Sequence, residues 1–391
     1  MKEVLFNTHD LALSFTIYQC LLFSLFAITL KRGKRSSNIL LSLFLLTQAA
    51  IPLDNLINFG EVFRFKALEF SPNIFYTFGL GYWLEAPLLL FYVRSLIYKN
   101  FHFKPIDLVY FLPFLLYFVY FYVNWLAVDN DVKLLTLQGE VVADASTLDR
   151  GIHLFREVFR FCCGLLCLVE LRRYKKLLIN EVSELESVNL NWLNILAIGF
   201  VFIEFIAIFV AVAIFSSYEL HVVLDHETLG LMSNYAVMLL VSVLIFFSAS
   251  HSTLFKGVDD SLVVKQNKKQ IEPELLNKIE QYMQLHKPFL NPLLTQENLA
   301  NQLEIAPRTL SIIINHHYKK NFFEFINNYR IEESKALLVK ANHQKTTMLD
   351  IMDMAGFNSK ATFNTFFKKL TGVTPTQYRK EFGMKESEQK V

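Results

Sequence analysis

Two stretches near the C-terminal end of the 391-residue chain place basic, polar and small side chains on one face of a helix. Apolar residues recur at helical spacing in both, with Leu310, Ile313 and Ile314 in the first and Phe363 and Phe367 in the second. Hydrogen-bonding groups on the opposite face suit the base edges of a DNA groove, and an aliphatic side chain among them suits a thymine methyl group. A solvated helix surface is the alternative for each position. The outward residues are Arg308, Ser311, Ile312 and Asn315 in the first stretch, and Ser359, Lys360, Thr362, Asn364, Thr365 and Lys368 in the second.

Three further lysines, Lys319, Lys320 and Lys369, lie close to these stretches and are better placed to meet phosphates. Such contacts would position a protein on DNA without reading its sequence. Residues 265–391 hold 19 Lys and Arg against 13 Asp and Glu, whereas the whole chain has a net charge of only +2. A basic surface of this size suits nucleic acid, but a solvated surface or a contact with anionic lipid explains the charge equally well.

The elements that must position these residues form a repeated pattern. Helical spacing predicts a short helix, a turn at Glu304 and Ile305, and a second helix that Pro307 opens. After a longer helix the same plan returns with the same apolar offsets, which indicates two helix-turn-helix units in tandem. The predicted helices cover 272–285, 296–303, 307–318, 322–340, 348–354 and 359–370.

The stretch from Ile351 to Arg379 resembles the AraC/XylS family of transcription regulators. The upstream unit fits the family more loosely. The resemblance implies double-stranded DNA as the partner and two recognition helices in one chain, lying in successive major grooves about 34 Å apart. The residues that carry it are Phe363, Phe366-Phe367-Lys368-Lys369 and Thr371-Gly372-x-Thr374-Pro375-x2-Tyr378-Arg379, with Leu299-Ala300, Leu310 and Arg330-x6-Leu337-Leu338 upstream.

Three positions depart from the family pattern. Met352 stands where the family has Ala, Lys319 where it has Gly, and Ala306 where it has an N-capping Ser or Thr. Lys319 matters most, because a left-handed helix end costs a residue other than Gly about 1 kcal/mol. We therefore expect a first unit that is less rigid or ends differently.

The first 250 residues are strongly apolar. The chain is 53% hydrophobic, with a mean hydropathy of +0.32, which is unusual for a soluble protein. Seven segments are each long enough to cross a hydrocarbon core of about 30 Å as a helix. The expected spans are 11–30, 39–57, 73–97, 106–128, 151–171, 192–216 and 229–250.

Charge in the loops predicts the orientation of these spans. The odd-numbered loops hold 11 Lys and Arg, whereas the N-terminus and the even-numbered loops hold 5. Because basic residues near span ends stay on the cytoplasmic side, the N-terminus is expected outside the cell and residues after His251 in the cytoplasm.

These observations predict an all-α chain with a seven-span transmembrane sensor at 1–251, a linker at 252–271 and a tandem helix-turn-helix domain at 272–391. The combination resembles the membrane-anchored subgroup of the AraC/XylS family. It implies a multi-pass protein of the bacterial inner membrane, with a homodimer as a possible assembly, that couples a membrane or envelope signal to gene expression.

Charged residues inside the expected spans are costly unless they pair or serve a site. Glu85 and Glu204 lie near the middle of their spans, and Arg156 and Arg160 share one helix face at the i, i+4 spacing. We expect the two arginines to line an outward-open pocket for a small anionic or zwitterionic ligand, with Glu204 or Glu85 as the internal counter-ion. A buried salt bridge that holds the bundle together explains the same residues.

Motifs for catalysis are missing from the sequence. It has no H-E-x-x-H zinc motif, no phosphate-binding Gly loop and no nucleophile elbow, so we expect no enzyme activity, cofactor or metal site. An alternative function from a different class is a seven-span receptor whose cytoplasmic tail acts mainly through a protein partner.

Overall fold

The chain folds into two compact units. One contains Met1–Leu171 and Leu190–Gly257, and the other contains Arg172–Asn189 and Val258–Val391. The predicted linker, 252–271, lies outside the described residues. The computed structural model describes residues 7–29, 34–98, 100–139, 147–180, 182–183, 191–220, 226–251, 273–340 and 346–388.

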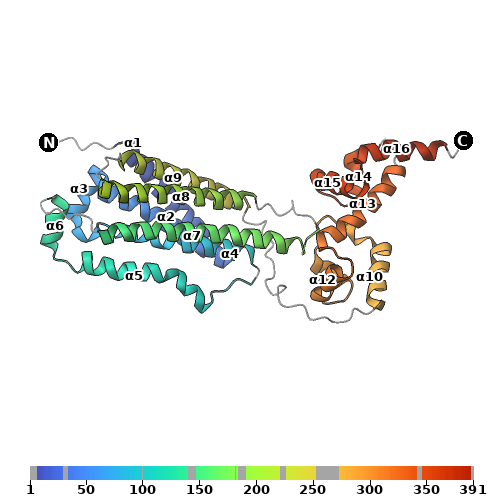
Figure 1. Cartoon of the computed structure of the whole chain (residues 1–391), viewed down its shortest axis with the longest axis horizontal. Helices are drawn as coiled ribbons and strands as arrows, with labels where there is room; N and C mark the ends of the chain where they lie inside the picture. The colour runs from blue at the N-terminus through green and yellow to red at the C-terminus, as the bar shows by residue number, and fades with distance from the viewer. Residues whose placement is uncertain are drawn as a thin grey trace. The chain divides into compact units, whose positions relative to one another are not determined.

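The first unit is a bundle of long helices (Figure 1). Helix α2 packs against α1 and α4, and α9 packs against α8 and α1. Helix α7 begins in this unit and ends in the second one, because the boundary between the units falls at Leu171. The long helices are α1 (Thr8–Thr29), α2 (Arg35–Phe59), α4 (Gly81–Ile97), α7 (Thr147–Leu178), α8 (Asn191–Leu220) and α9 (His226–His251).

Shorter elements connect the long helices of this unit. They include a π-helical turn, η4, directly after α5. The short elements are α3 (Glu61–Phe70), η1 (Pro72–Ile74), η2 (Phe78–Leu80), η3 (Pro105–Phe111), α5 (Leu112–Phe121), η4 (Tyr122–Leu126) and α6 (Asn130–Gln138).

Five helical stretches among the described residues are long and apolar enough to cross a membrane. They coincide with five of the seven spans expected from the sequence. The other two expected spans fall on α7, which carries several charged residues, and on α9, where the apolar stretch Asn234–Phe246 is shorter. The five stretches are Thr8–Thr29, Arg35–Phe59, Pro72–Ile97, Pro105–Leu126 and Leu193–Ala213.

The second unit is also helical, and the prediction of an all-α chain is confirmed: the named elements of the described residues are all helical, and an isolated antiparallel bridge joins Val182 to Thr295. The predicted helices are present, with ends that differ by no more than a few residues. They are α10 (Pro273–His286), α11 (Gln296–Gln302), α12 (Pro307–His316), α13 (Phe322–Lys340), α14 (Met348–Met354) and α15 (Lys360–Thr371). A further helix, α16 (Pro375–Glu388), and a 3-10 turn, η6 (Pro288–Leu290), are not among the predicted helices.

Two apolar cores lie along α13. The first core joins α10, α11 and α12 to the start of α13 and includes Leu299, Leu310 and Phe325. The second core joins α14 and α15 to the rest of α13 and includes Phe363 and Phe367. Helix α13 therefore contributes to the core of both helix pairs and connects them.

Candidate functional site

The first helix pair, α11 and α12, is held by local hydrogen bonds. The Thr295 hydroxyl caps α11 by accepting a bond from the Asn298 backbone N–H, at 3.1 Å. In the turn, the Ile305 N–H donates to the Ala300 carbonyl at 3.0 Å. The Gln296 side chain then crosses to α12 by donating to the Pro307 carbonyl at 2.8 Å.

The second pair, α14 and α15, repeats this geometry. Thr347 caps α14 and forms a reciprocal capping box with Asp350. The hydrogen bond from the Thr347 hydroxyl holds the pKa of the Asp350 carboxyl below its usual range. The Phe357 N–H donates to the Met352 carbonyl at 3.0 Å, the counterpart of the bond in the first turn. The expectation of two helix-turn-helix units built on one plan therefore agrees with the backbone.

The departures from the family pattern have visible consequences. Lys319 has a left-handed φ of 53°, the conformation that glycine provides most easily, and Gly372 has a φ of 80° at the end of α15. Ala306 precedes α12 without any side-chain cap. Met352 is buried in the second core. Helix α12 thus begins without a side-chain cap, and Lys319 just after it lies in the strained left-handed region.

The predicted DNA-contacting residues lie mostly on one accessible face of each recognition helix. The inward residues Leu310, Ile313 and Ile314 of α12 and Phe363 and Phe367 of α15 are buried. The exposed members of the predicted set are Arg308, Asn315, Lys319, Lys360, Asn364, Thr365, Lys368 and Lys369, and the half-buried members are Ser311, Ile312, Lys320 and Thr362.

Ser359 differs from the rest of the set. Its side chain is buried, and its hydroxyl accepts a hydrogen bond from the Thr362 N–H at 3.1 Å. This bond makes Ser359 the N-cap of α15. The hydroxyl therefore has a structural partner within the helix.

Lys369 and Asn315 also have intramolecular partners. Lys369 lies 3.1 Å from a Glu324 carboxylate oxygen on α13. Asn315 donates to the Ser311 carbonyl at 2.9 Å, one turn earlier on α12. Before they could bond to DNA, these two side chains would have to exchange or share their present partners.

One polar contact supports the first recognition helix from behind. The Tyr318 hydroxyl, just after α12, donates to a Glu280 carboxylate oxygen on α10 at 3.2 Å. Burial of the ring and the adjacent carboxylate raise the pKa of Tyr318 well above its usual range, so the hydroxyl keeps its proton.

Comparisons with known proteins agree with this geometry. Residues 299–381 match the family described as a helix-turn-helix domain. The chain is 29% identical over 97 residues to YtdP of Bacillus subtilis (strain 168), an uncharacterized HTH-type transcriptional regulator. That match covers 25% of this chain and 12% of the relative. No solved structure matches the chain. The family match therefore places a helix-turn-helix domain within the C-terminal part of the chain, at residues 299–381.

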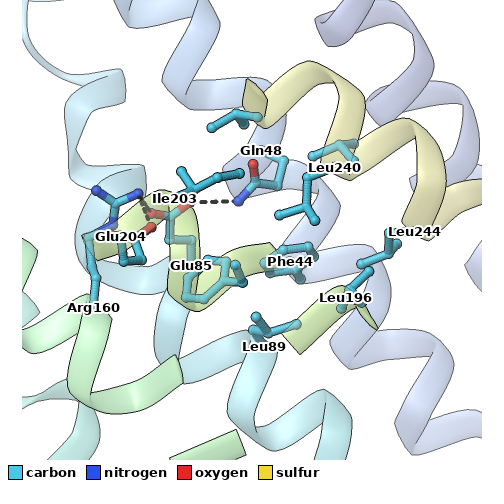
Figure 2. A pocket seen from close by; sticks show the side chains of 13 residues that line it. Phe44, Gln48, Glu85, Leu89, Arg160, Leu196, Ile203, Glu204, Leu240 and Leu244 are labelled. Carbon is cyan, nitrogen blue, oxygen red and sulfur yellow. Dashed lines mark hydrogen bonds and ion pairs between the residues drawn. The ribbon is translucent and has the colours of Figure 1, made fainter. Parts of the chain in front are cut away.

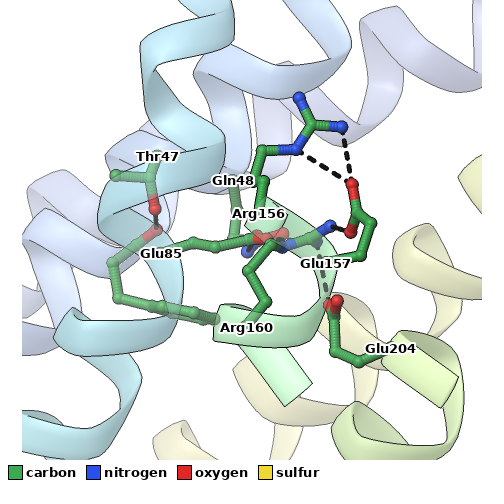
Figure 3. Close-up of polar contacts among 8 residues, drawn as sticks. Thr47, Gln48, Glu85, Arg156, Glu157, Arg160 and Glu204 are labelled. Carbon is green, nitrogen blue, oxygen red and sulfur yellow. Dashed lines mark hydrogen bonds and ion pairs between the residues drawn. The ribbon is translucent and has the colours of Figure 1, made fainter. Parts of the chain in front are cut away.

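A second candidate site is a group of charged residues buried in the first unit (Figure 3). Arg160 of α7 pairs with Glu85 of α4, with Glu157 one turn earlier, and with Glu204 of α8, the last at 2.8 Å. Arg156 pairs with the same Glu157 at 2.6 Å. We call these five residues the charge cluster. Three carboxylates therefore surround two guanidinium groups.

Neighbouring side chains complete the charge cluster. The Gln48 amide of α2 donates to Glu85 at 2.6 Å. The guanidinium carbons of Arg156 and Arg160 lie 4.3 and 5.3 Å from the centre of the Tyr82 ring. The cluster thus connects α2, α4, α7 and α8.

A small cavity lies beside the charge cluster (Figure 2). Its volume is about 20 Å3, which is room for about one water molecule. Glu85, Arg160 and Glu204 contribute its polar lining, and residues such as Phe44 and Leu240 contribute the apolar side. One Glu204 carboxylate oxygen is buried and forms no hydrogen bond. A ligand larger than water would need the helices to separate.

The structure brings together residues that the sequence singled out and adds others. Arg160, Glu85 and Glu204 converge from three helices, while Arg156 is linked to them through Glu157. Sequence reasoning left Glu157 out of the site, although its spacing of three residues before Arg160 places it on the same helix face.

Proposed function

We propose that the chain is a membrane-held, sequence-specific transcription regulator that converts a signal at the membrane into a change in gene expression. The observation that carries this proposal is the presence, in one chain, of a duplicated helix-turn-helix unit and of apolar helices with exposed apolar faces. On α8, Phe202, Phe205 and Phe209 are 62%, 60% and 70% exposed. Such a surface is a liability in water, whereas a lipid bilayer would cover it.

The proposed topology has seven spans, with the N-terminus outside and the DNA-binding domain in the cytoplasm of a bacterial cell. The five apolar stretches support it, together with the bias of basic residues between loops. Helix α7 is included as a span because its Arg156 and Arg160 are paired with carboxylates inside the bundle.

DNA binding in this proposal uses α12 and α15 as the two recognition helices. Their exposed polar residues would contact base edges, and Lys319, Lys320, Lys368 and Lys369 would contact phosphates. A dimer would double the number of grooves contacted. The proposed role of the charge cluster is to receive the signal, by binding a small anionic or zwitterionic ligand that competes with Glu157 for Arg156.

The direct experiment measures DNA binding by the full chain in lipid nanodiscs. Duplexes from upstream of its own coding region and a random-sequence pool are both offered, at several salt concentrations. We expect binding that weakens steeply with salt, because Lys and Arg release counterions from phosphates. The double variant Lys360→Ala with Asn364→Ala should lose the sequence preference, and Lys335→Ala on α13 is the matched control.

A chain that binds neither DNA sample at low salt would contradict the proposal. The alternative, a seven-span receptor whose tail acts through a protein partner, would then be favoured.

A further inference from the structure

A short segment that follows α7 lies inside the second unit. Ile179 and Asn180 form the turn after the helix, and Val182 pairs with Thr295 in an isolated antiparallel bridge at the start of α11. Leu178, Val182 and Ser183 are buried. In the sequence this segment belongs to the loop between the fifth and sixth expected spans, far from the helix-turn-helix domain. We call the described residues of this stretch, 178–180 and 182–183, the docking segment.

The docking segment is bound mainly through its backbone. The Ser183 N–H donates to the Leu294 carbonyl at 3.2 Å, and the Ile179 carbonyl accepts from the Phe323 N–H at the start of α13, at 3.0 Å. The Ser183 hydroxyl also donates to the Leu294 carbonyl, at 2.8 Å. These bonds attach the segment to the turn before α11 and to the beginning of α13.

A fully buried arginine, Arg330, lies at the centre of this contact. Arg330 of α13 donates to the Ser183 carbonyl at 2.9 Å and to the Ser183 hydroxyl oxygen at 3.0 Å. Arg330 also donates to the carbonyls of Phe289, at 2.7 Å, and Asn291, at 2.9 Å. A buried guanidinium has five N–H donors that need acceptors. If Ser183 moved away, buried N–H groups of Arg330 would be left without acceptors, which costs free energy.

Arg330 lies where the two helix-turn-helix units meet. Phe289 belongs to the first core, whereas the Phe357 ring, 5.6 Å from the Arg330 guanidinium carbon, belongs to the second. At the same place Gly356, in the turn of the second helix-turn-helix unit, lies directly against the backbone of Phe289 and Leu290. Ser183 therefore completes the joint that sets how one unit is oriented against the other.

We propose that the docking segment holds this joint in the orientation needed for both recognition helices to contact DNA together. The inference rests on the proposed DNA-binding function and adds its regulation. Docking restricts the motion of the two helix-turn-helix units relative to each other before DNA binds, so less conformational entropy is lost on binding. Undocking restores that motion and the entropy cost. Because α7 carries Arg156, Glu157 and Arg160 as well as the start of the docking segment, it links the charge cluster to the joint within one helix.

The first arm of the test detects docking without DNA. Val182→Cys with Thr295→Cys is introduced into the full chain, in membranes, after Cys20, Cys162, Cys163 and Cys167 are replaced by Ala. Paired residues of an antiparallel bridge have Cα atoms close enough for a disulfide. We expect efficient crosslinking on mild oxidation, and little for the control pair with Lys176→Cys in place of Val182→Cys. Equal, weak crosslinking of both pairs would overturn the docking.

The second arm measures the consequence for DNA. The full chain in nanodiscs selects a tandem-site duplex from a random pool, and a truncated duplex retains the site of one recognition helix only. Ser183→Pro removes the Ser183 N–H and should weaken tandem-site binding about two- to tenfold, the cost of ordering one or a few groups. Half-site binding should not change. Ser183→Ala should weaken tandem-site binding by a smaller factor, and Lys176→Ala should leave tandem-site binding unchanged.

The outcomes separate the two proposals. If the wild-type chain selects no DNA, the proposed function fails while the crosslinking arm still decides whether the segment docks. If Ser183→Pro and Ser183→Ala bind tandem-site DNA like the wild-type chain, or the oxidised Val182→Cys/Thr295→Cys chain binds it more weakly than the reduced chain, the proposed role of docking is wrong.

Discussion

Gly356 lies so close to Phe289 that a β-carbon on Gly356 would meet the Phe289 carbonyl oxygen at 2.6 Å. Gly356 also has a φ of 83°, so two independent reasons exclude a side chain there. The contact joins the turn of the second helix-turn-helix unit to the η6 turn of the first.

Gly356→Ala should therefore destabilise the second helix-turn-helix unit. The left-handed backbone costs about 1 kcal/mol and the forced backbone shift about 1 to 3 kcal/mol more. Gly372→Ala is the matched control, because Gly372 has a φ of 80° but no atom within 4 Å of the new β-carbon. The free energy of unfolding, measured by pulse proteolysis, should fall much further for Gly356→Ala. Equal losses would show that the close approach has no energetic weight.

Lys319→Gly should separate stability from DNA binding. Glycine relieves the left-handed strain at this position, and we expect the free energy of unfolding to rise by about 0.5 to 1 kcal/mol. DNA affinity should nevertheless fall, because a charge that is proposed to contact phosphate is lost. Lys319→Asn, which also tolerates the left-handed region, tests the backbone explanation. A loss of stability in both variants would contradict it.

Capping predicts opposite effects at the two recognition helices. Ala306→Ser supplies the missing N-cap of α12 and should stabilise the unit by about 1 kcal/mol, whereas Ser359→Ala removes the cap of α15 and should cost about the same. Thermal unfolding of the two variants beside the wild-type chain checks both signs. Unchanged stability in Ser359→Ala would mean that its buried hydroxyl contributes nothing.

Lys368 and Lys369 should differ in their effect on DNA binding, although they are neighbours in the sequence. Lys369 is paired with Glu324, whereas Lys368 is exposed on α15. Lys368→Ala should lower the slope of log affinity against log salt by about 0.9, the value for one phosphate contact, and Lys369→Ala by less. Glu324→Gln should strengthen DNA binding by releasing Lys369. Identical slopes for the two lysine variants would contradict this prediction.

The charge cluster should tolerate the loss of Arg156 far better than the loss of Arg160. Arg160→Ala leaves three buried carboxylates without their shared partner, and breaking a buried pair costs about 3 to 5 kcal/mol, so low expression is expected. Arg156→Ala removes the contacts with Glu157 and the Tyr82 ring but leaves the Arg160 ion pairs in place, so it is the cleaner test of signal reception. With normal expression, an unchanged reporter response in Arg156→Ala, compared with Arg156→Lys, would exclude Arg156 from the signal site.

The helix-turn-helix units could be predicted from the sequence because their signals are local. Apolar spacing, Pro307 at a helix start and Gly372 at a helix end act within a few residues, and the observed helices follow them closely. The local signal at Ser359 was ambiguous, since a serine before a helix can cap it or face a ligand, and the structure shows the cap.

The docking segment could not be predicted in the same way. Ser183 and Arg330 are separated by 147 residues, and most of the bonds that hold the segment involve backbone atoms, which no residue type reveals. The pairing of Lys369 with Glu324 is also long-range, across 45 residues. The cost of charge in an apolar helix predicts that Arg160 needs a partner, but only the packing of α4 and α8 decides which carboxylates reach it.

Helix α7 has a geometric property that bears on the proposed coupling between the charge cluster and the docking segment. Arg160 and Leu178 are 18 positions apart, which corresponds to about five turns and roughly 27 Å of helix. Since five whole turns return to the same direction, both residues point from one side of the helix, and both are buried. A rotation of α7 about its own axis at Arg160 would therefore turn Leu178 in the same direction.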